Sequence, residues 1–176
     1  AFIAAQQGKK VLLVDLDPDG AIPRIFKSEK LSFSPRVLAD NIEGIFITPY
    51  FSLKEYVTRQ LKFSRLTDLI LDNKIMHFLM DAAPGIEEIA LMGKIFYLSQ
   101  EKINNKPRWD TLIIDAPATG HGLYLFKAPR TFLDIVRTGP LRKQSHDIYR
   151  LMTSPKRSAI HIVTLPEELP VQETLE

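Results

Sequence analysis

The stretch KVLLVDL at Lys10–Leu16 runs directly into Asp17, and the shorter stretch TLII at Thr111–Ile114 runs into Asp115. Short apolar runs that are rich in branched side chains are typical of strands buried on both faces of a parallel sheet. In open parallel sheets, ligands bind beyond the carboxyl ends of the strands. The two aspartates therefore fall where a binding site is expected.

Two further runs predict strands, Ser158–Leu165 (SAIHIVTL) and, more weakly, Ile45–Thr48 (IFIT). Helical patterns lie between the runs: Leu53–Leu61, and a span from Leu66 in which Met76, Leu79, Met80 and Ala83 follow helical spacing. Parallel strands need crossover connections, and these are usually helices. The alternation therefore predicts an α/β fold with a parallel β-sheet covered by helices on both faces.

The chain has 176 residues, of which 45% are hydrophobic and 25% charged, the balance of an ordinary globular domain. It contains no repeat or linker, so we expect one domain over residues 1–176. Ala1–Gln7 is typical of the end of a helix that closes at Gly8, and Pro170 of the first residue of a helix at Val171–Glu176. We therefore expect an internal part of a longer chain, incomplete at both ends.

Composition and charge argue against several classes of protein. Lys and Arg number 23 against 21 acidic residues, so the net charge of +2 gives no broad cationic face, and no nucleic-acid partner is expected. No apolar run approaches the roughly 18 residues of a membrane span, so no direct membrane insertion is expected. The sequence has no cysteine, which excludes disulfides and thiolate metal sites within it and is compatible with a reducing compartment. We expect a soluble protein of the cytoplasm.

Flexible turns follow both aspartates. Pro18, Asp19 and Gly20 come after Asp17, and Ala116–Gly122 (APATGHG) comes after Asp115. Glycine allows backbone amides to approach a phosphate closely, and a carboxylate holds Mg²⁺ through its waters. Together the two strand ends predict a phosphate and magnesium site, whereas the alternative is that both aspartates only cap helices.

Three other features leave alternatives open. Ile86–Leu98 is apolar almost all round, which is typical of a helix buried in its own domain or of one at a subunit or client interface. The basic stretch Arg137–Lys143 (RTGPLRK) either contacts phosphates or a partner, or is a solvated loop. His121 has no second ligand at helical spacing, so metal coordination by it is not expected.

Six segments resemble one family, the ArsA-type ATPases, which include arsenical pump-driving ATPases and the ATPase that targets tail-anchored membrane proteins. They are, in order, GKKVLLVDLDP (Gly8–Pro18), LKEY (Leu53–Tyr56), AAPGIEE (Ala82–Glu88), WDTLIIDAPATGHGL (Trp109–Leu123), TGPLRKQ (Thr138–Gln144) and VTLPEELPVQET (Val163–Thr174). The amino-acid sequences of the fourth and sixth segments are most similar to those of bacterial members of the family. The resemblance implies a P-loop NTPase-like fold that uses ATP and Mg²⁺.

The resemblance also implies roles for single residues. Asp17 matches the first-switch aspartate that positions or activates the attacking water, and Pro18 follows it at the nucleotide. Asp115 matches the second-switch aspartate near Mg²⁺. Thr119, Gly120 and His121 fall in the second switch and are expected to contact the nucleotide.

The chain departs from the family pattern in several ways. It has no Gly-x-x-x-x-Gly-Lys-Ser/Thr, so the family's phosphate loop is expected upstream of the helix that here begins at Ala1. Asp19-Gly20-Ala21 replaces the common Ala-x-Asn after the first-switch Asp-Pro, so a polar switch contact is lost or replaced. The arsenite-binding cysteines and a Met-rich helical insertion have no counterpart here, which argues against As(III) as activator and leaves the cargo open.

The sequence favours an ATPase that hydrolyses ATP at the interface of a homodimer and couples movement of its switch loops to a protein or membrane-protein client. Phosphoryl transfer needs mainly positioning and charge stabilisation, which a few aspartates, backbone amides, Mg²⁺ and an upstream lysine supply. One alternative is a partitioning or division-site ATPase that acts on DNA or membrane. The other is a non-catalytic interaction domain that lacks the phosphate loop.

Overall fold

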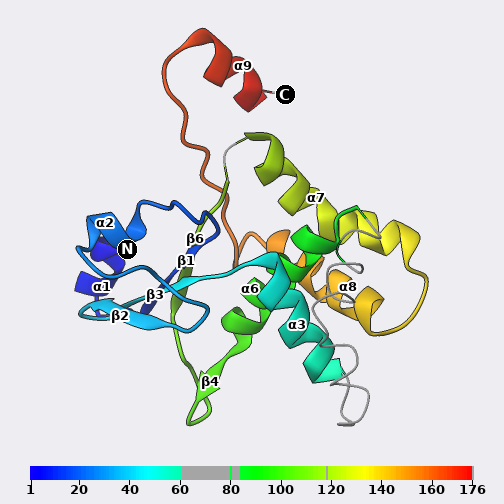
Figure 1. Cartoon of the computed structure of the whole chain (residues 1–176), viewed down its shortest axis with the longest axis horizontal. Helices are drawn as coiled ribbons and strands as arrows, with labels where there is room; N and C mark the ends of the chain where they lie inside the picture. Colours follow the sequence, from blue (N-terminus) through cyan, green and yellow to red (C-terminus); the bar gives the residue numbers. More distant parts are fainter. Residues whose placement is uncertain (61–79, 81–83, 118, 176) are drawn as a thin grey trace. The chain divides into compact units, whose positions relative to one another are not determined.

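The computed structural model describes residues 1–60, 80, 84–117 and 119–175 of the chain. It divides into two compact units, residues 1–117 and residues 118–176 (Figure 1). That both belong to a single domain stays a prediction.

The first unit is built on a four-stranded sheet with the order β2-β3-β1-β6. Its strands are β1 (Val11–Asp15), β2 (Arg36–Ala39), β3 (Ile42–Phe46) and β6 (Thr111–Asp115). The central strand β1 pairs in parallel with both β3 and β6, whereas β2 pairs antiparallel with β3. The expected α/β fold is confirmed, and the expected parallel sheet is parallel except for β2. The edge strand β2 was not expected, and it joins β3 through a tight turn in which Asn41 has a φ of 59°.

One face of the sheet is covered by α1 (Phe2–Gln6) and α2 (Ile22–Ile25). Val11 and Leu13 of β1 pack there with Ile22, and alanines of α1 complete the cluster. After α1 the chain turns at Gly8, which has a φ of 77°, so the expected left-handed glycine at the end of this helix is confirmed.

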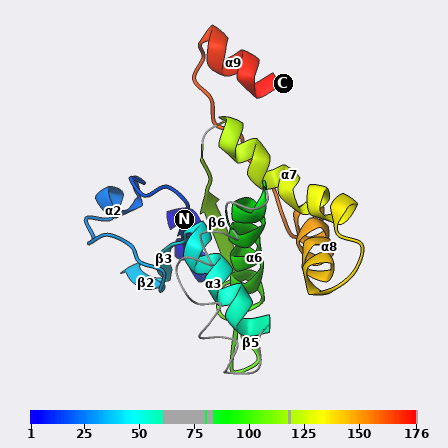
Figure 2. The ribbon, with the colours of Figure 1, turned by 45° about the vertical axis from the view of Figure 1, so that its right-hand side comes forward.

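The other face of the sheet is covered by α3 (Pro49–Gln60) and α6 (Ile86–Gln100), which pack against each other (Figure 2). Both expected helices are therefore confirmed where the structure describes them. The span from Leu66 to Ala83 lies outside the described residues, apart from Met80. Of the two interpretations of α6, burial within its own unit is supported by six buried residues: Ile89, Ala90, Met92, Gly93, Ile95 and Leu98.

A small hairpin precedes β6 where the sequence shows only a polar loop. It pairs β4 (Lys102–Ile103) with β5 (Lys106–Pro107). Asn104 and Asn105 connect the strands with φ values of 51° and 63°. A two-residue turn with positive φ at both positions matches the twist of a hairpin, and asparagine tolerates that backbone better than most residues.

The second unit contains α7 (Thr119–Ile135), α8 (Pro140–Met152) and α9 (Glu168–Leu175). α7 packs against α8. Arg142 links them, because its guanidinium donates hydrogen bonds to the carbonyl oxygens of Leu133 and Val136 at 2.6 and 2.7 Å. These carbonyls lie at the end of α7, where no further helical turn supplies N–H donors to them. Part of the basic stretch Arg137–Lys143 therefore has a structural role.

Two expectations for the second unit are wrong. Ser158–Leu165 forms no strand, and Ile160, Ile162 and Val163 are 61%, 68% and 95% exposed. An apolar pattern makes a strand only where a neighbouring strand exchanges backbone hydrogen bonds with it, and the described residues provide none for this segment. The second error concerns the start of the last helix, because α9 begins at Glu168 and not at Pro170. Pro170 is the third residue of α9, a position in the first turn where its missing N–H costs no helical hydrogen bond.

No helix in the described part of the chain is both long enough and apolar enough to cross a membrane.

Candidate functional site

Two aspartates lie side by side at the carboxyl edge of the sheet. β1 ends at Asp15 and β6 ends at Asp115, and the parallel register places these two residues directly opposite each other. The strand thus ends two residues before Asp17, not at Leu16 as the apolar run indicates. Adjacent strands lie about 4.8 Å apart, so the two carboxylates share one end of the sheet.

Asp17 lies in a tight turn that follows β1. The N–H of Gly20 donates to the carbonyl oxygen of Asp17 at 3.0 Å, and the N–H of Asp19 donates to the Asp17 Oδ1 at 2.9 Å. Aspartate first, Pro18 second and glycine fourth is a favourable order for such a turn. The turn leaves Asp17 and Pro18 exposed at the edge of the sheet.

Asp15 is the buried member of the site. Its side chain is 2% exposed, and its Oδ1 accepts a hydrogen bond from the N–H of Asp17 at 3.1 Å. Burial raises the pKa of the Asp15 carboxyl, the hydrogen bond from Asp17 opposes this, and the negative charges of Asp115 and Asp17 raise it further. The sequence prediction left Asp15 out, although a charged residue inside an otherwise apolar strand was a signal that could have identified it.

Asp115 is exposed and suited to a magnesium ion. Mg²⁺ prefers oxygen ligands and usually keeps several waters, so one or two carboxylates at an open edge match its needs. Within the described residues, no group of three or more histidine, cysteine, aspartate or glutamate side chains could enclose a metal. The donor set therefore fits a magnesium ion that water and phosphate oxygens help to hold, and does not fit an ion caged by protein alone.

The predicted second-switch residues Thr119, Gly120 and His121 form the beginning of α7. The backbone there is helical, whereas the glycines had suggested a loop. The first amides of a helix have no intrahelical acceptors and are favourable donors to an anion. These residues belong to the second unit and their side chains lie outside the description, so their contact with a nucleotide stays a prediction.

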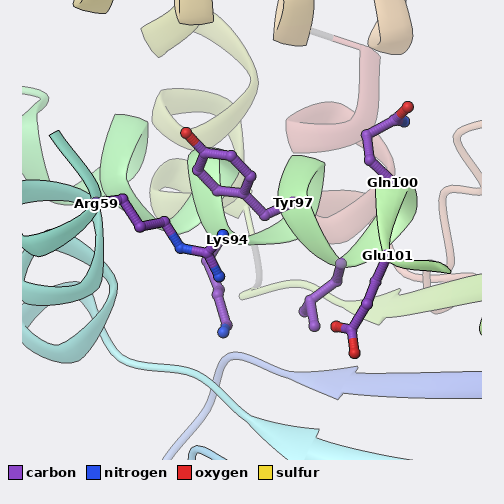
Figure 3. Close-up of a pocket in the computed structure, with 6 residues that line it drawn as sticks. Arg59, Lys94, Tyr97, Gln100 and Glu101 are labelled. Carbon is purple, nitrogen blue, oxygen red and sulfur yellow. The ribbon is translucent and has the colours of Figure 1, made fainter. Parts of the chain in front are cut away.

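A separate hollow of about 310 Å³ lies between α3 and α6. Figure 3 shows Arg59 reaching across from α3 toward Tyr97, with Lys94, Gln100 and Glu101 along α6 and at its end. Both cations are already engaged, because Lys94 and Arg59 donate to the same carboxylate, that of Glu55, the lysine at 2.6 Å. The hollow therefore offers no unpaired positive charge from Arg59 or Lys94 to an anionic ligand.

A comparison with protein families identifies the family of this chain. The sequence model of the family described as "Anion-transporting ATPase" matches residues 1–146. The chain belongs to this family. The relationship inferred from the six sequence segments is therefore confirmed, and the match includes the whole carboxyl edge of the sheet with Asp15, Asp17 and Asp115.

Two relatives illustrate the breadth of the anion-transporting ATPase family. ATPase BagA of Mycobacterium tuberculosis is 30% identical over 182 residues, which cover 100% of this chain and 53% of that protein. ATPase GET3 of Lachancea thermotolerans is 26% identical over 140 residues, which cover 76% of this chain and 40% of that protein. The chain thus spans about half the length of the curated relatives that it matches, or less.

Proposed function

We propose that this chain is the nucleotide-hydrolysing part of an ATPase of the anion-transporting family. The observation that carries the proposal is the arrangement at one edge of the sheet, where β1 leads into the turn of Asp17 and the adjacent strand β6 ends at Asp115. Parallel sheets bind their ligands at this edge. The family relationship supports a nucleoside triphosphate as the ligand.

Each site residue has a proposed role. The exposed Asp17 accepts a hydrogen bond from the attacking water and orients it, with Pro18 beside the nucleotide in the same turn. Asp115 holds the waters of Mg²⁺, while Thr119, Gly120 and His121 contact the phosphates from the start of α7. When bound, Mg²⁺ neutralises charge on the phosphate oxygens. The phosphate loop of the family does not occur in this sequence, so we place it upstream in a longer protein.

We further propose that the longer protein works as a homodimer in the cytoplasm, that residues 1–176 belong to one domain, and that hydrolysis moves the switch residues against a protein or membrane-protein client. Nucleic acid is not a proposed partner, in keeping with a net charge of +2. The relatives' names, ATPase BagA and ATPase GET3, support hydrolysis but do not identify the cargo of this protein.

The test of the proposed function is phosphate release from ATP by the full-length protein, with and without Mg²⁺. We expect Asp17→Asn to lower the single-turnover rate by roughly 10²- to 10⁴-fold, the scale of a positioned acid–base group, with ATP affinity largely kept. Asp40→Asn is the matched control, since Asp40 is an exposed turn residue between β2 and β3 at the opposite edge of the sheet. If the unmodified full-length protein releases no phosphate, the proposed hydrolysis is wrong, and the alternative of a non-catalytic interaction domain remains.

A further inference from the structure

Asp15 is a buried carboxylate that the proposed reaction does not use. It occupies the last position of the central strand, on the same face of β1 as Val11 and Leu13, and is 2% exposed. Burying a carboxylate is costly unless hydrogen bonds compensate. A charged residue kept in this place therefore requires an explanation in terms of what it contacts.

Asp15 contacts the turn that carries Asp17 at two points. Its Oδ1 accepts the hydrogen bond from the N–H of Asp17 at 3.1 Å. Its carboxylate also lies so close to Gly20 that a Cβ at position 20 would overlap both of its oxygens. The backbone of Gly20 does not have a positive φ, so glycine is needed here for the close approach. The side chain thus touches both ends of the four-residue turn.

We propose that Asp15 is a positioning residue that holds the turn Asp17–Gly20 against the end of β1 and so sets the direction of the Asp17 carboxylate. The inference rests on the proposed function, in which Asp17 orients the attacking water. Asp15 acts through Asp17, because it is buried and its Oδ1 is directed to the backbone of the turn.

A second aspartate provides a matched comparison at the other end of the same strand. The Oδ2 of Asp110 accepts a hydrogen bond from the N–H of Lys10 at 2.9 Å, just before β1 begins. Asp110 and Asp15 therefore make the same kind of bond to the backbone, one at each end of β1. Only Asp15 bonds to the turn that contains Asp17, so only its removal should affect the reaction.

The decisive variants, made in the full-length protein, are Asp15→Ala and Asp15→Asn. Alanine removes the acceptor, and we expect kcat for ATP hydrolysis to fall by about 10- to 10²-fold, the effect of misplacing a catalytic group, with little change in KM. Asparagine keeps an acceptor oxygen in the same place, so it should restore kcat to within about threefold of the parent. Asp110→Ala should leave kcat unchanged although it also loses a backbone hydrogen bond.

Gly20→Ala tests the close approach independently. In the parent the added methyl group must displace either the turn or Asp15, so we expect a loss of kcat comparable with that of Asp15→Ala. In the Asp15→Ala background the methyl group has room, and the double variant should be no slower than Asp15→Ala alone. Such non-additivity is expected of residues that are in contact or share one network, and not of independent sites.

Hydrogen exchange of the amides of residues 16, 17, 19 and 20 supplies a readout that does not depend on catalysis, residue 18 being a proline without an amide hydrogen. Faster exchange in Asp15→Ala, with parent-like exchange in Asp15→Asn and Asp110→Ala, is the expected result. The inference is overturned if Asp15→Ala keeps parent kcat and parent exchange, or if the effects of Asp15→Ala and Gly20→Ala simply add. Failure of the proposed function is a distinct outcome, namely a folded parent protein that releases no phosphate.

Discussion

Asp115 at the end of β6 lies directly opposite Asp15 at the end of β1, across a parallel ladder, yet Asp15 is buried and Asp115 is exposed. The difference arises because the turn after β1 folds back over Asp15, as its contacts with Asp17 and Gly20 show. Of these two carboxylates, that of Asp115 is therefore accessible, whereas that of Asp15 binds the backbone of the turn. This division of roles underlies the first prediction.

Asp115→Asn should raise the Mg²⁺ concentration needed for half-maximal ATP hydrolysis by about 10- to 10²-fold, because the ion loses a negatively charged oxygen partner. A magnesium titration of phosphate release by the full-length protein measures the effect. Asp110→Asn is the control, since Asp110 precedes the same strand at its opposite end. An unchanged magnesium requirement in Asp115→Asn would remove Asp115 from the metal site.

Met92→Glu should destabilise the folded protein by about 3 kcal/mol or more, because it places an unpaired carboxylate where the side chain is 6% exposed. Thermal melting measures the loss, and Met92→Leu, which keeps the volume, should melt close to the parent. The neighbouring Leu91 is only half-buried, so Leu91→Glu should cost less. If Met92→Glu melts like the parent but no longer dimerises with ATP in light scattering, α6 is an interface helix after all.

Glu55 should contribute stability that disappears in acid. Burial alone would raise its pKa, but hydrogen bonds from Lys94 and Arg59, together with their charges, outweigh this and lower the pKa of Glu55 below its ordinary value. A lowered pKa in the folded state contributes stability above the unfolded pKa, and this contribution is lost as the pH falls through the folded pKa.

The Glu55→Gln variant measures this contribution. We expect it to be less stable than the parent by about 1 kcal/mol at pH 7, with a difference that shrinks steadily once the pH falls below the ordinary glutamate range near 4. Glu29→Gln is the control, because Glu29 pairs with Arg36 while 84% exposed and should contribute little at any pH. A difference between Glu55→Gln and the parent that stays constant down to pH 2 would contradict the assignment.

Much of the fold could be predicted because the signals are local. β1 and β6 are continuous apolar runs, and such a run predicts a strand without knowledge of its neighbours. β1 is buried throughout, whereas β6 lies at the edge of the sheet and is half-buried or exposed. Gly8 marked the end of α1 because few residues other than glycine adopt its left-handed backbone readily. The edge strand β2 and the hairpin before β6 were missed, since short exposed strands carry little hydrophobic pattern.

The segment Ser158–Leu165 shows where a local pattern is insufficient. Its apolar and β-branched side chains are typical of a strand. A strand also requires a partner for its backbone N–H and C=O groups, and the sequence of one segment contains no information about that partner. In the part of the chain that the structure describes, residues 158–165 accordingly form no strand, and residues 159–165 are exposed.

The sequence by itself determined the family and the α/β fold with parallel pairing of β1 and β6, and it predicted Asp17 and Asp115 as site residues, because motifs and apolar runs are contiguous in the chain. Only the tertiary structure decided that Asp15 is buried beneath the turn, that it binds the amide of Asp17, and that it stands opposite Asp115. Those relations depend on strand register and on a turn folding back over its own strand. Residues 100 positions apart become neighbours only when the sheet forms, and no local pattern encodes their distance.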